Sequence, residues 1–357
     1  MKKTAIGLFS GGLDSCLAVK LMLEQGFRTI CLSFDLWKYP KEEDSVHPLK
    51  PKAEMLGAEF MSIDLSDEYP DLIYHPRWGY GSVINPCIDC KLLMLLKAAE
   101  VMKQENADLV FTGEVLGQRP MTQTKTIMKM LEKQSGLKGR LLRPLCAKLL
   151  TPTIPEQDGI VDREKLMNIQ GRGRNRQIEM AEKYGLEDYP SPAGGCVLTQ
   201  KEYGGKAADM MIYAGKPLSV EALELLKTGR HFRISPDAKL IVGRNEKEND
   251  ILEGFRKGRI ALQPADTLGP LALIDGKPSD SDIDIALRIT ARYTKEKRSQ
   301  SVRLILMKDS GSTVFDVKPI SDTEMETFRI NFDKKKIHRF YIEHCPEKDL
   351  EGQRTEE

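Results

Sequence analysis

The chain has 357 residues, a formal net charge of +1 and seven cysteines. This length predicts two or three domains, each able to bury its own core, and the near-balance of charge excludes a uniformly basic nucleic-acid binder. The N-terminus lacks the length and cleavage site of a signal peptide, no segment is long enough to span a membrane, and an odd number of cysteines is not typical of a disulfide framework. We therefore expect a cytoplasmic protein with reduced thiols, in which any RNA contact uses a local patch.

The first motif is SGGLDS, at residues 10–15, between an apolar run at 5–9 typical of a buried strand and a helical apolar spacing at 16–25. Paired glycines let the backbone approach an anion, and the amides of the first helical turn, with the Ser10 and Ser15 hydroxyls, can donate to phosphate oxygens. No lysine follows the glycines, and their spacing is not that of a dinucleotide fingerprint. The segment predicts a pyrophosphate site, with a glycine turn that only caps a helix as the simpler interpretation.

Strands and helices then alternate, with strands predicted at 29–34 and 59–65 and a helix at 49–56. Such alternation is typical of a parallel α/β sheet. Ligands of open α/β sheets bind at the carboxyl ends of the strands, so we expect the backbone around Phe34 to contact the adenine of a nucleotide.

Residues 85–91 read NPCIDCK and precede an apolar helix predicted at 92–102. Cys87 and Cys90 lie three residues apart at a helix start, where they could ligate one metal ion or share one redox reaction, and helix amides favour the thiolate form. Zinc, thiol exchange and iron–sulfur sites all use such a pair, and two small buried side chains are the simpler interpretation.

A strand predicted at 108–114 ends in small residues and continues through VLGQRPMTQT. Gly113 fits a place where backbone approaches a nucleotide, and Gln118 is placed to donate near the substrate, unless the block is only a polar loop after a core strand. Further on, TPTIP at 151–155 predicts a loop that leaves the sheet.

Three arginines, Arg172, Arg174 and Arg176, alternate with glycines and an asparagine at the start of a predicted helix. Charge runs usually form a solvated face, but arginines beside glycines can also follow the phosphate backbone of an RNA. Cys196 comes later, after paired glycines, where a lone cysteine is usually incidental.

The remaining sequence predicts a second unit that starts near residue 229. Its predicted elements are strands at 231–234, 239–244, 271–276 and 301–307 and helices at 245–255 and 282–293. The tail after Arg339 is predicted to be mobile.

Three motifs of the first half resemble known families. SGGLDS is similar to the PP-loop of the ATP pyrophosphatase superfamily, whose members cleave ATP between its α and β phosphates. NPCIDCK resembles the NPC-x-x-C segment of the tRNA 2-thiouridylases, with Lys91 in place of their usual Asn. TGEVLGQ with its following QT, and RPL at 143–145, resemble the ThiI-type tRNA 4-thiouridine synthases. The resemblance implies that Asp14 lies near Mg²⁺ and the phosphates, and the residues expected at the ATP site are Ser10, Gly11, Gly12, Asp14, Ser15, Phe34, Gly113 and Gln118.

The cysteines acquire two alternative roles from this resemblance. In relatives with an iron–sulfur cluster a third cysteine joins the CxxC pair, which implies Cys87, Cys90 and Cys196 as ligands of a 4Fe-4S cluster with one open iron that can hold sulfide. Alternatively, one cysteine carries a persulfide and a second resolves the resulting disulfide. Spacing does not separate the two.

The C-terminal unit resembles the NFACT-R type of RNA-binding domain through VGRNEKENDIL, GPLALI and IALRITARYTK. The residues expected to contact RNA there are Arg244, Asn245, Asn249, Arg292, Lys295 and Lys297, each with ordinary surface charge or polarity as the alternative.

Together these features predict a Rossmann-like parallel α/β sheet of the PP-loop ATPase type with a smaller C-terminal α+β domain. The expected divisions are a PP-loop domain at 1–165, a helical connecting region at 166–228, an RNA-binding domain at 229–335 and a mobile tail at 336–357.

The predicted function is an ATP-dependent tRNA sulfurtransferase, which adenylates a uridine carbonyl oxygen and replaces it with sulfur. The residues expected to carry the reaction are Asp14, Cys87, Cys90 and Cys196. The expected partners are tRNA and a sulfur donor, either sulfide or a cysteine desulfurase, and the chain could form a homodimer. The alternatives are an adenylating enzyme that sulfurates or amidates a small metabolite, and an RNA-binding module with a nucleotide-sensing domain.

Overall fold

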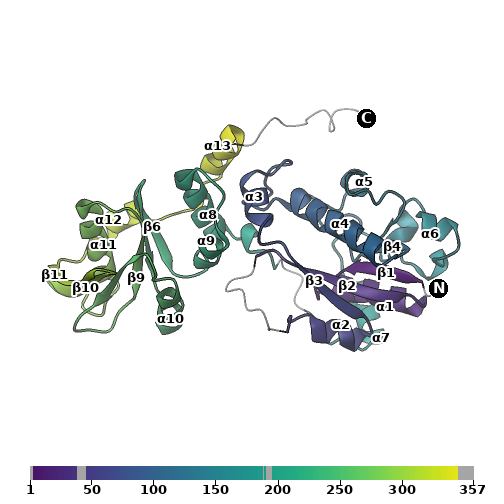
Figure 1. The fold of residues 1–357 in the computed structure, drawn as a ribbon, viewed down its shortest axis with the longest axis horizontal. Coiled ribbons are helices and arrows are strands. Elements are labelled where there is room, and N and C mark those ends of the chain that lie inside the picture. Colours follow the sequence, from purple (N-terminus) through teal and green to yellow (C-terminus); the bar gives the residue numbers. More distant parts are fainter. Residues whose placement is uncertain (1–2, 38–45, 188, 190–194, 345–357) are drawn as a thin grey trace. The chain divides into compact units, whose positions relative to one another are not determined.

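The computed structural model describes residues 3–37, 46–187, 189 and 195–344. The chain forms two compact units, Met1–Gly195 and Cys196–His344, shown in Figure 1. The predicted connecting region at 166–228 is not a unit of its own, because its first part belongs to the first unit and its second part to the second.

The first unit is built on a parallel sheet with the strand order β3-β2-β1-β4-β5. Its strands are β1 (Thr4–Leu8), β2 (Arg28–Asp35), β3 (Glu59–Asp64), β4 (Leu109–Thr112) and β5 (Leu141–Leu142). Its helices are α1 (Leu13–Glu24), α2 (Lys50–Leu56), α3 (Tyr69–Tyr74), α4 (Cys87–Gln104), α5 (Lys125–Gln134), α6 (Ile154–Gln157) and α7 (Asn175–Lys183). This arrangement confirms the predicted Rossmann-like α/β class.

Helices cover both faces of this sheet. Successive residues of a strand point to opposite faces, so each strand packs into two cores. Ala5 of β1 packs in the core that α1 and α2 complete, whereas Ile6 packs in the core that α4 and α5 complete. Every residue of β1 is therefore buried, as expected for a central strand of a parallel sheet. Figure 1 shows α4 and α5 on one side of the strands and α1 and α2 on the other.

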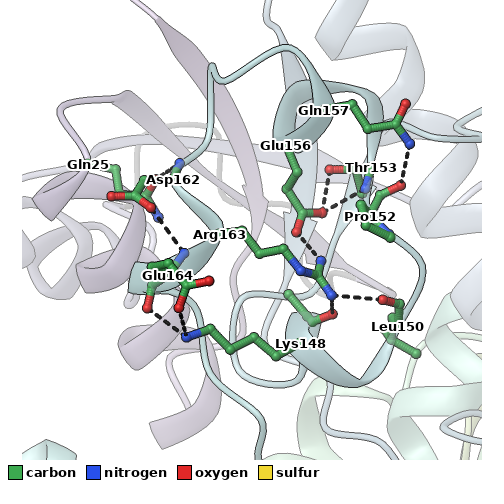
Figure 2. Close-up of polar contacts among 11 residues, drawn as sticks. Gln25, Lys148, Leu150, Pro152, Thr153, Glu156, Gln157, Asp162, Arg163 and Glu164 are labelled. Atoms are coloured by element: carbon green, nitrogen blue, oxygen red, sulfur yellow. Dashed lines mark hydrogen bonds and ion pairs between the residues drawn. The ribbon is translucent and has the colours of Figure 1, made fainter.

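The segment that follows β5, residues 147–165, belongs to the first unit, and Figure 2 shows its polar contacts. Arg163 pairs with Glu156 and donates through Nη2 to the carbonyl oxygens of Ala147 and Leu150, both at 3.0 Å. Glu156 also accepts from the backbone and hydroxyl of Thr153 at 2.7 Å each, which caps α6. The predicted loop at 151–155 is therefore short: residues 151–153 have no regular structure, and α6 begins at Ile154.

The second unit is an antiparallel sheet with the order β11-β10-β8-β9-β7-β6. Its strands are β6 (Arg230–Ser235), β7 (Ala238–Val242), β8 (Ile260–Pro264), β9 (Ala272–Gly276), β10 (Val302–Lys308) and β11 (Gly311–Val317). Its helices are α8 (Lys201–Ala214), α9 (Val220–Leu225), α10 (Glu246–Gly254), α11 (Asp280–Arg292), α12 (Asp322–Phe328) and α13 (Lys334–His344). One core lies between the sheet and α11, and another between the sheet, α9 and α10. The predicted α+β class of this domain is confirmed.

Part of the predicted mobile tail is helical. Residues 334–344 form α13, in which Ile337 and Phe340 are buried, so the mobile-tail prediction was wrong for this part. Residues 345–357 lie outside the described residues. Across the ranges that the structure describes, we find no helix with the length and apolar character of a membrane span.

Candidate active site

The SGGLDS segment forms the turn between β1 and α1, as predicted. Gly11 has a φ of +69°, a left-handed conformation that favours glycine. Gly12 is the N-cap of α1 and supplies no capping side chain, so the amides of the first helical turn are left to donate elsewhere. Ser15 Oγ donates to the Gly12 carbonyl at 2.8 Å, and Ser10 Oγ lies 3.4 Å from Ser15 Oγ. A hydroxyl-lined helix start of this kind suits phosphate oxygens.

Gly113, at the end of β4, lies against the same turn. A Cβ atom at this position would stand 2.6 Å from the carbonyl carbon and oxygen of Asp14 and 2.7 Å from the backbone nitrogen of Ser15. The glycine is therefore required by contact between two backbone segments of the protein, and not only by the nucleotide approach that the sequence suggested. This contact ties the TGE block to the first turn of α1.

The Asp14 carboxylate has one satisfied and one unsatisfied oxygen. Oδ2 accepts from Gln118 Nε2 at 3.1 Å and from Arg174 Nη2 at 3.3 Å. Oδ1 is buried and has no hydrogen-bond partner. A buried carboxylate oxygen without a partner fits Mg²⁺, which prefers oxygen ligands.

Arg174 reaches the loop because two glycine turns hold its segment beside the TGE block. Leu116 forms an isolated parallel bridge with Gln170, and the Gly171 amide donates to the Leu116 carbonyl at 2.7 Å. Both Gly117 and Gly171 have φ near +80°. The structure thus places Arg174 beside the SGGLDS turn, and its predicted RNA contact stays a prediction.

Its two neighbours in the arginine run behave differently. Arg172 and Arg176 are exposed, and Arg176 donates to Asn168 Oδ1 at 2.7 Å. Their predicted RNA contacts stay predictions.

The two cysteines of NPCIDCK occupy the first turn of α4. The Asn85 side chain donates to Cys87 Sγ at 3.1 Å, and the Tyr69 hydroxyl donates to Cys90 Sγ at 3.4 Å. Both residues are half-buried, and neither forms a disulfide within the described residues. Asn85 is itself fixed, because its Oδ1 accepts from the Val83 amide at 3.1 Å. Sequence reasoning missed both donors, although the Asn-Pro that precedes Cys87 was a signal for the first.

Glu114 connects the predicted motifs to one another. It is 3% exposed, its Oε2 accepts from Thr112 Oγ1 at 3.0 Å and Arg143 Nε at 3.3 Å, and Lys91 Nζ lies 3.7 Å from its Oε1. Burial alone would raise the pKa of Glu114, but the charges of Lys91 and Arg143 and the hydrogen bond from Thr112 hold it below its ordinary value. One carboxylate therefore joins NPCIDCK, TGE and RPL.

Neither Glu114 nor Lys91 was singled out as a site residue from the sequence. Lys91 was noticed only as a departure from the 2-thiouridylase pattern. Its pairing with a glutamate from a distant segment is the physical reason for a lysine at that position.

The Phe34 side chain packs in the core that α4 covers, beside Met61 and Ile63. Its backbone pairs with Ile63 in the sheet. The expected adenine contact, which was assigned to the backbone around Phe34, stays a prediction.

Cys196 belongs to the second unit, where it is half-buried and starts a short 3₁₀ turn, Val197–Thr199. Within the described part of either unit, no three His, Cys, Asp or Glu side chains gather as a metal site. Two of the three proposed thiol ligands are thus in one unit and the third is in the other.

Most of the predicted RNA residues of the second unit have partners within it. Arg244 pairs with Glu248 at 3.0 Å, and Arg292 donates to Asp322 at 2.8 Å. Asn245 caps α10, and Asn249 Oδ1 accepts from the Leu271 amide at 3.0 Å. Lys295 and Lys297 are exposed in the turn after α11.

The first unit is a Rossmann-like α/β domain whose first strand and helix are joined by the SGGLDS turn, and the second unit is a separate α+β domain. Comparison with known families agrees with both parts: residues 1–148 match the family model described as thiamine biosynthesis protein (ThiI), and residues 229–329 match the model of the NFACT protein RNA binding domain. The two resemblances expected from the sequence are confirmed.

Among curated proteins, the chain is similar to the tRNA-specific 2-thiouridylase MnmA of Geobacter metallireducens, with 28% identity over 133 residues, 31% of this chain and 35% of the relative. The MnmA of Flavobacterium johnsoniae is 34% identical over 129 residues, 32% of this chain and 31% of the relative. The chain therefore spans about a third of the length of these relatives.

Among solved structures, a 4-thiouridine synthetase in complex with RNA and ATP is 19% identical, with a TM-score of 0.35 over 52% of this chain and 41% of that chain. At such a low score and identity nothing further follows from this likeness.

Proposed function

We propose that the protein is an ATP-dependent tRNA sulfurtransferase that adenylates a uridine carbonyl oxygen and replaces it with sulfur. The observation that carries this proposal is the position of Glu114. The residue before Glu114, Gly113, contacts the backbone of Asp14 and Ser15 in the loop. The carboxylate of Glu114 pairs with Lys91, the residue after Cys90. The loop proposed to bind ATP and the pair of cysteines are thereby connected within one unit.

The first half-reaction follows from the loop. A uracil carbonyl oxygen is a poor leaving group and has to be activated. It attacks the α-phosphorus of ATP, and the bond from this phosphorus to the oxygen that bridges to the β-phosphate breaks. Pyrophosphate then lies where the helix amides and the Ser10 and Ser15 hydroxyls donate. Asp14 would hold Mg²⁺, which neutralises phosphate charge.

The second half-reaction uses the cysteines. Sulfur attacks the activated ring carbon, the carbon–oxygen bond breaks, and AMP leaves. In one route the sulfur is the outer atom of a persulfide on Cys87 or Cys90, and the other thiol attacks the inner sulfur, which leaves a disulfide for an external thiol to reduce.

In the other route Cys87, Cys90 and Cys196 would hold a 4Fe-4S cluster, which supplies an open iron for sulfide. Three thiols suit iron, and the two in the first unit lie one helical turn apart.

RNA recognition is assigned to the second unit, which matches an RNA-binding family over 229–329. Lys295 and Lys297 supply exposed positive charge there. Sulfide is the proposed sulfur donor for the cluster route, and a cysteine desulfurase, which delivers sulfane sulfur, is the proposed donor for the persulfide route. The target base would have to leave its stack to reach the loop.

The decisive experiment incubates the full-length protein, prepared without oxygen, with unmodified tRNA, ATP and Mg²⁺. Separate reactions contain sulfide, or a cysteine desulfurase with cysteine, as the sulfur donor. Nucleosides are then analysed by mass spectrometry. We expect one thiouridine to form together with AMP, and Asp14→Asn to abolish both products. Pyrophosphate release that does not depend on RNA would instead favour the small-metabolite enzyme, and intact ATP would favour the nucleotide-sensing module.

The same analysis of total tRNA from cells with and without the gene would identify the modified base. Disappearance of one thionucleoside is expected. An unchanged set, in cells without a compensating enzyme, would contradict the proposed substrate.

A further inference from the structure

The ATP loop carries no positive charge of its own. Residues 10–15 contain one carboxylate, Asp14, and no lysine or arginine. Walker loops meet the charge of the β and γ phosphates with a lysine that follows the glycines. In this chain a cation for the same phosphates has to come from another segment.

Arg174 is a basic side chain that the structure brings to this loop. Its side chain is 15% exposed, and Nη2 lies 3.3 Å from Asp14 Oδ2. Charge-assisted N–H···O bonds are usually about 2.7–2.9 Å long, so this one is far from optimal. The Nε atom of Arg174 is buried and has no hydrogen-bond partner. The contact with Asp14 thus leaves part of the guanidinium's donor capacity unused.

Other unsatisfied polar atoms lie in the same segments. Asp14 Oδ1 is buried without a partner, and so are both amide atoms of Gln177, one turn beyond Arg174 in α7. Buried polar atoms without partners are rare in folded proteins and often mark the place of a bound group or water. Of these atoms, Asp14 Oδ1 and Arg174 Nε belong to the two residues that contact each other, which favours a polar ligand at that contact.

The position of Arg174 does not depend on its contact with Asp14. The backbone of its segment is held by the Leu116–Gln170 bridge and the Gly171 to Leu116 hydrogen bond. Beyond it, Ala181 of α7 packs with Leu13 and Leu17 of α1. The guanidinium can therefore change partners while the helix stays in place.

We propose that Arg174 binds the β and γ phosphates of ATP, and then the released pyrophosphate, in exchange for its contact with Asp14. The inference rests on the function proposed above. Phosphate oxygens carry more charge than one carboxylate and match the planar fork of a guanidinium. The exchange also frees Asp14 Oδ2 for a metal ion, beside the unpartnered Oδ1.

This assignment separates Arg174 from the other two arginines of its run. Arg172 and Arg176 are exposed and lie on either side of it in the sequence. A role in RNA binding remains the prediction for those two alone.

The test measures the binding of magnesium pyrophosphate to the full-length protein by calorimetry, for the wild type, Arg174→Ala and the control Arg176→Ala. We expect Arg174→Ala to lower the affinity about 10- to 100-fold, the loss expected for charge-assisted hydrogen bonds. Arg176→Ala should stay within about twofold of the wild type. Adenosine, which has no phosphates, should bind all three proteins equally.

Unchanged pyrophosphate affinity in Arg174→Ala would overturn the inference, and a loss of RNA affinity in the same variant would return Arg174 to the RNA surface. If Arg174→Ala also loses adenosine binding, the same measurements are made on Arg174→Lys. Normal adenosine binding with weakened pyrophosphate binding in this variant supports the inference. Any other result overturns it. A wild-type protein that does not bind pyrophosphate would contradict the proposed function itself. A wild type that binds it and thiolates RNA, with a fully active Arg174→Ala, would overturn this inference alone.

Discussion

In the first unit, Asp14 contacts Gln118 and Glu114 contacts Lys91, the residue after Cys90. In the second unit, by contrast, most of the predicted RNA residues have partners within their own domain. The first set leaves buried polar atoms such as Asp14 Oδ1 without partners. In the second set, Arg292 is paired with Asp322, and Asn245 caps a helix. Contiguous motifs at a strand end are placed by the fold itself, while scattered charged and polar positions can serve folding instead of binding.

The largest effect is expected at the thiols. Cys90→Ala should lower thiouridine formation about a thousandfold or more, because a sulfur carrier is removed, while ATP affinity stays unchanged. Cys146→Ala is the matched control, since burial raises the pKa of the Cys146 thiol to about 11 and it hydrogen-bonds the Glu114 carbonyl. Wild-type thiolation in Cys87→Ala, Cys90→Ala and Cys196→Ala alike would remove the cysteines from the proposed reaction.

The next largest effect is expected at Glu114. Glu114→Gln leaves Lys91 and the buried Arg143 without their shared carboxylate, which should cost about 3–5 kcal/mol in the free energy of unfolding measured with urea. Glu164→Gln is the control, because Glu164 is exposed and pairs with Lys148 at the surface; it should cost less than about 1 kcal/mol. Equal stabilities of the two variants would contradict the central role of Glu114.

The contacts of Glu114 also predict how the stability depends on pH. The pKa of Glu114 lies below its ordinary value of 4.5 in the folded protein, so its stabilisation is complete above that value and is lost as the pH falls through the folded pKa. The stability difference between wild type and Glu114→Gln should therefore shrink as the pH is lowered from neutral to about pH 3. A stability difference that grows as the pH falls would contradict the lowered pKa of Glu114.

A smaller effect is expected at Gly113. In Gly113→Ala the new methyl group meets the backbone of Asp14 and Ser15, which should cost about 1–3 kcal/mol and displace the first turn of α1. ATP affinity measured by calorimetry should fall with it. At Gly173, by contrast, a Cβ atom would have nothing within 4 Å of it, so Gly173→Ala should bind ATP normally, and a similar loss in both would contradict the close approach.

The smallest effect is expected in the second unit. Replacing Lys295 and Lys297 by Ala should weaken RNA binding a few-fold and lower the slope of log affinity against log salt by about 0.7–0.9 for each lost phosphate contact, with unfolding unchanged. Asn249→Ala is the contrast: it removes the acceptor of the Leu271 amide and should cost about 1 kcal/mol of stability. An unchanged salt slope in the double variant would exclude this turn from the RNA contact.

The sequence predicted the Rossmann-like sheet, the loop and the thiol pair because each is encoded within a few consecutive residues. It missed Glu114 as a connection, because Lys91, Glu114 and Arg143 meet only when α4, β4 and β5 are folded together. The strands β5, β8 and β11 and the helix α12 were also missed. β5 has only two residues, too few to show a period, whereas β11 is as long as β10, which was predicted.

Arg174 was singled out for its charge, but its partner could not be foreseen. The bridge between Leu116 and Gln170 joins segments far apart in the chain, and nothing local announces it. Cys196 shows the reverse: the resemblance to cluster-binding relatives suggested a role for it, and its assignment to the second unit required the fold.

The way in which residues 147–165 stay with the first unit, through Arg163 and Glu156, bears on how the chain can be divided for expression. A fragment cut at residue 165 would lack Ile169 and Ala181, which cover the apolar side chains of Leu13, Leu17 and Leu21. Such a fragment would expose an apolar patch and aggregate. A cut after Gly195 keeps this cover, and it separates the nucleotide loop from Cys196, so the two pieces could be purified apart and mixed to ask whether sulfur chemistry needs both.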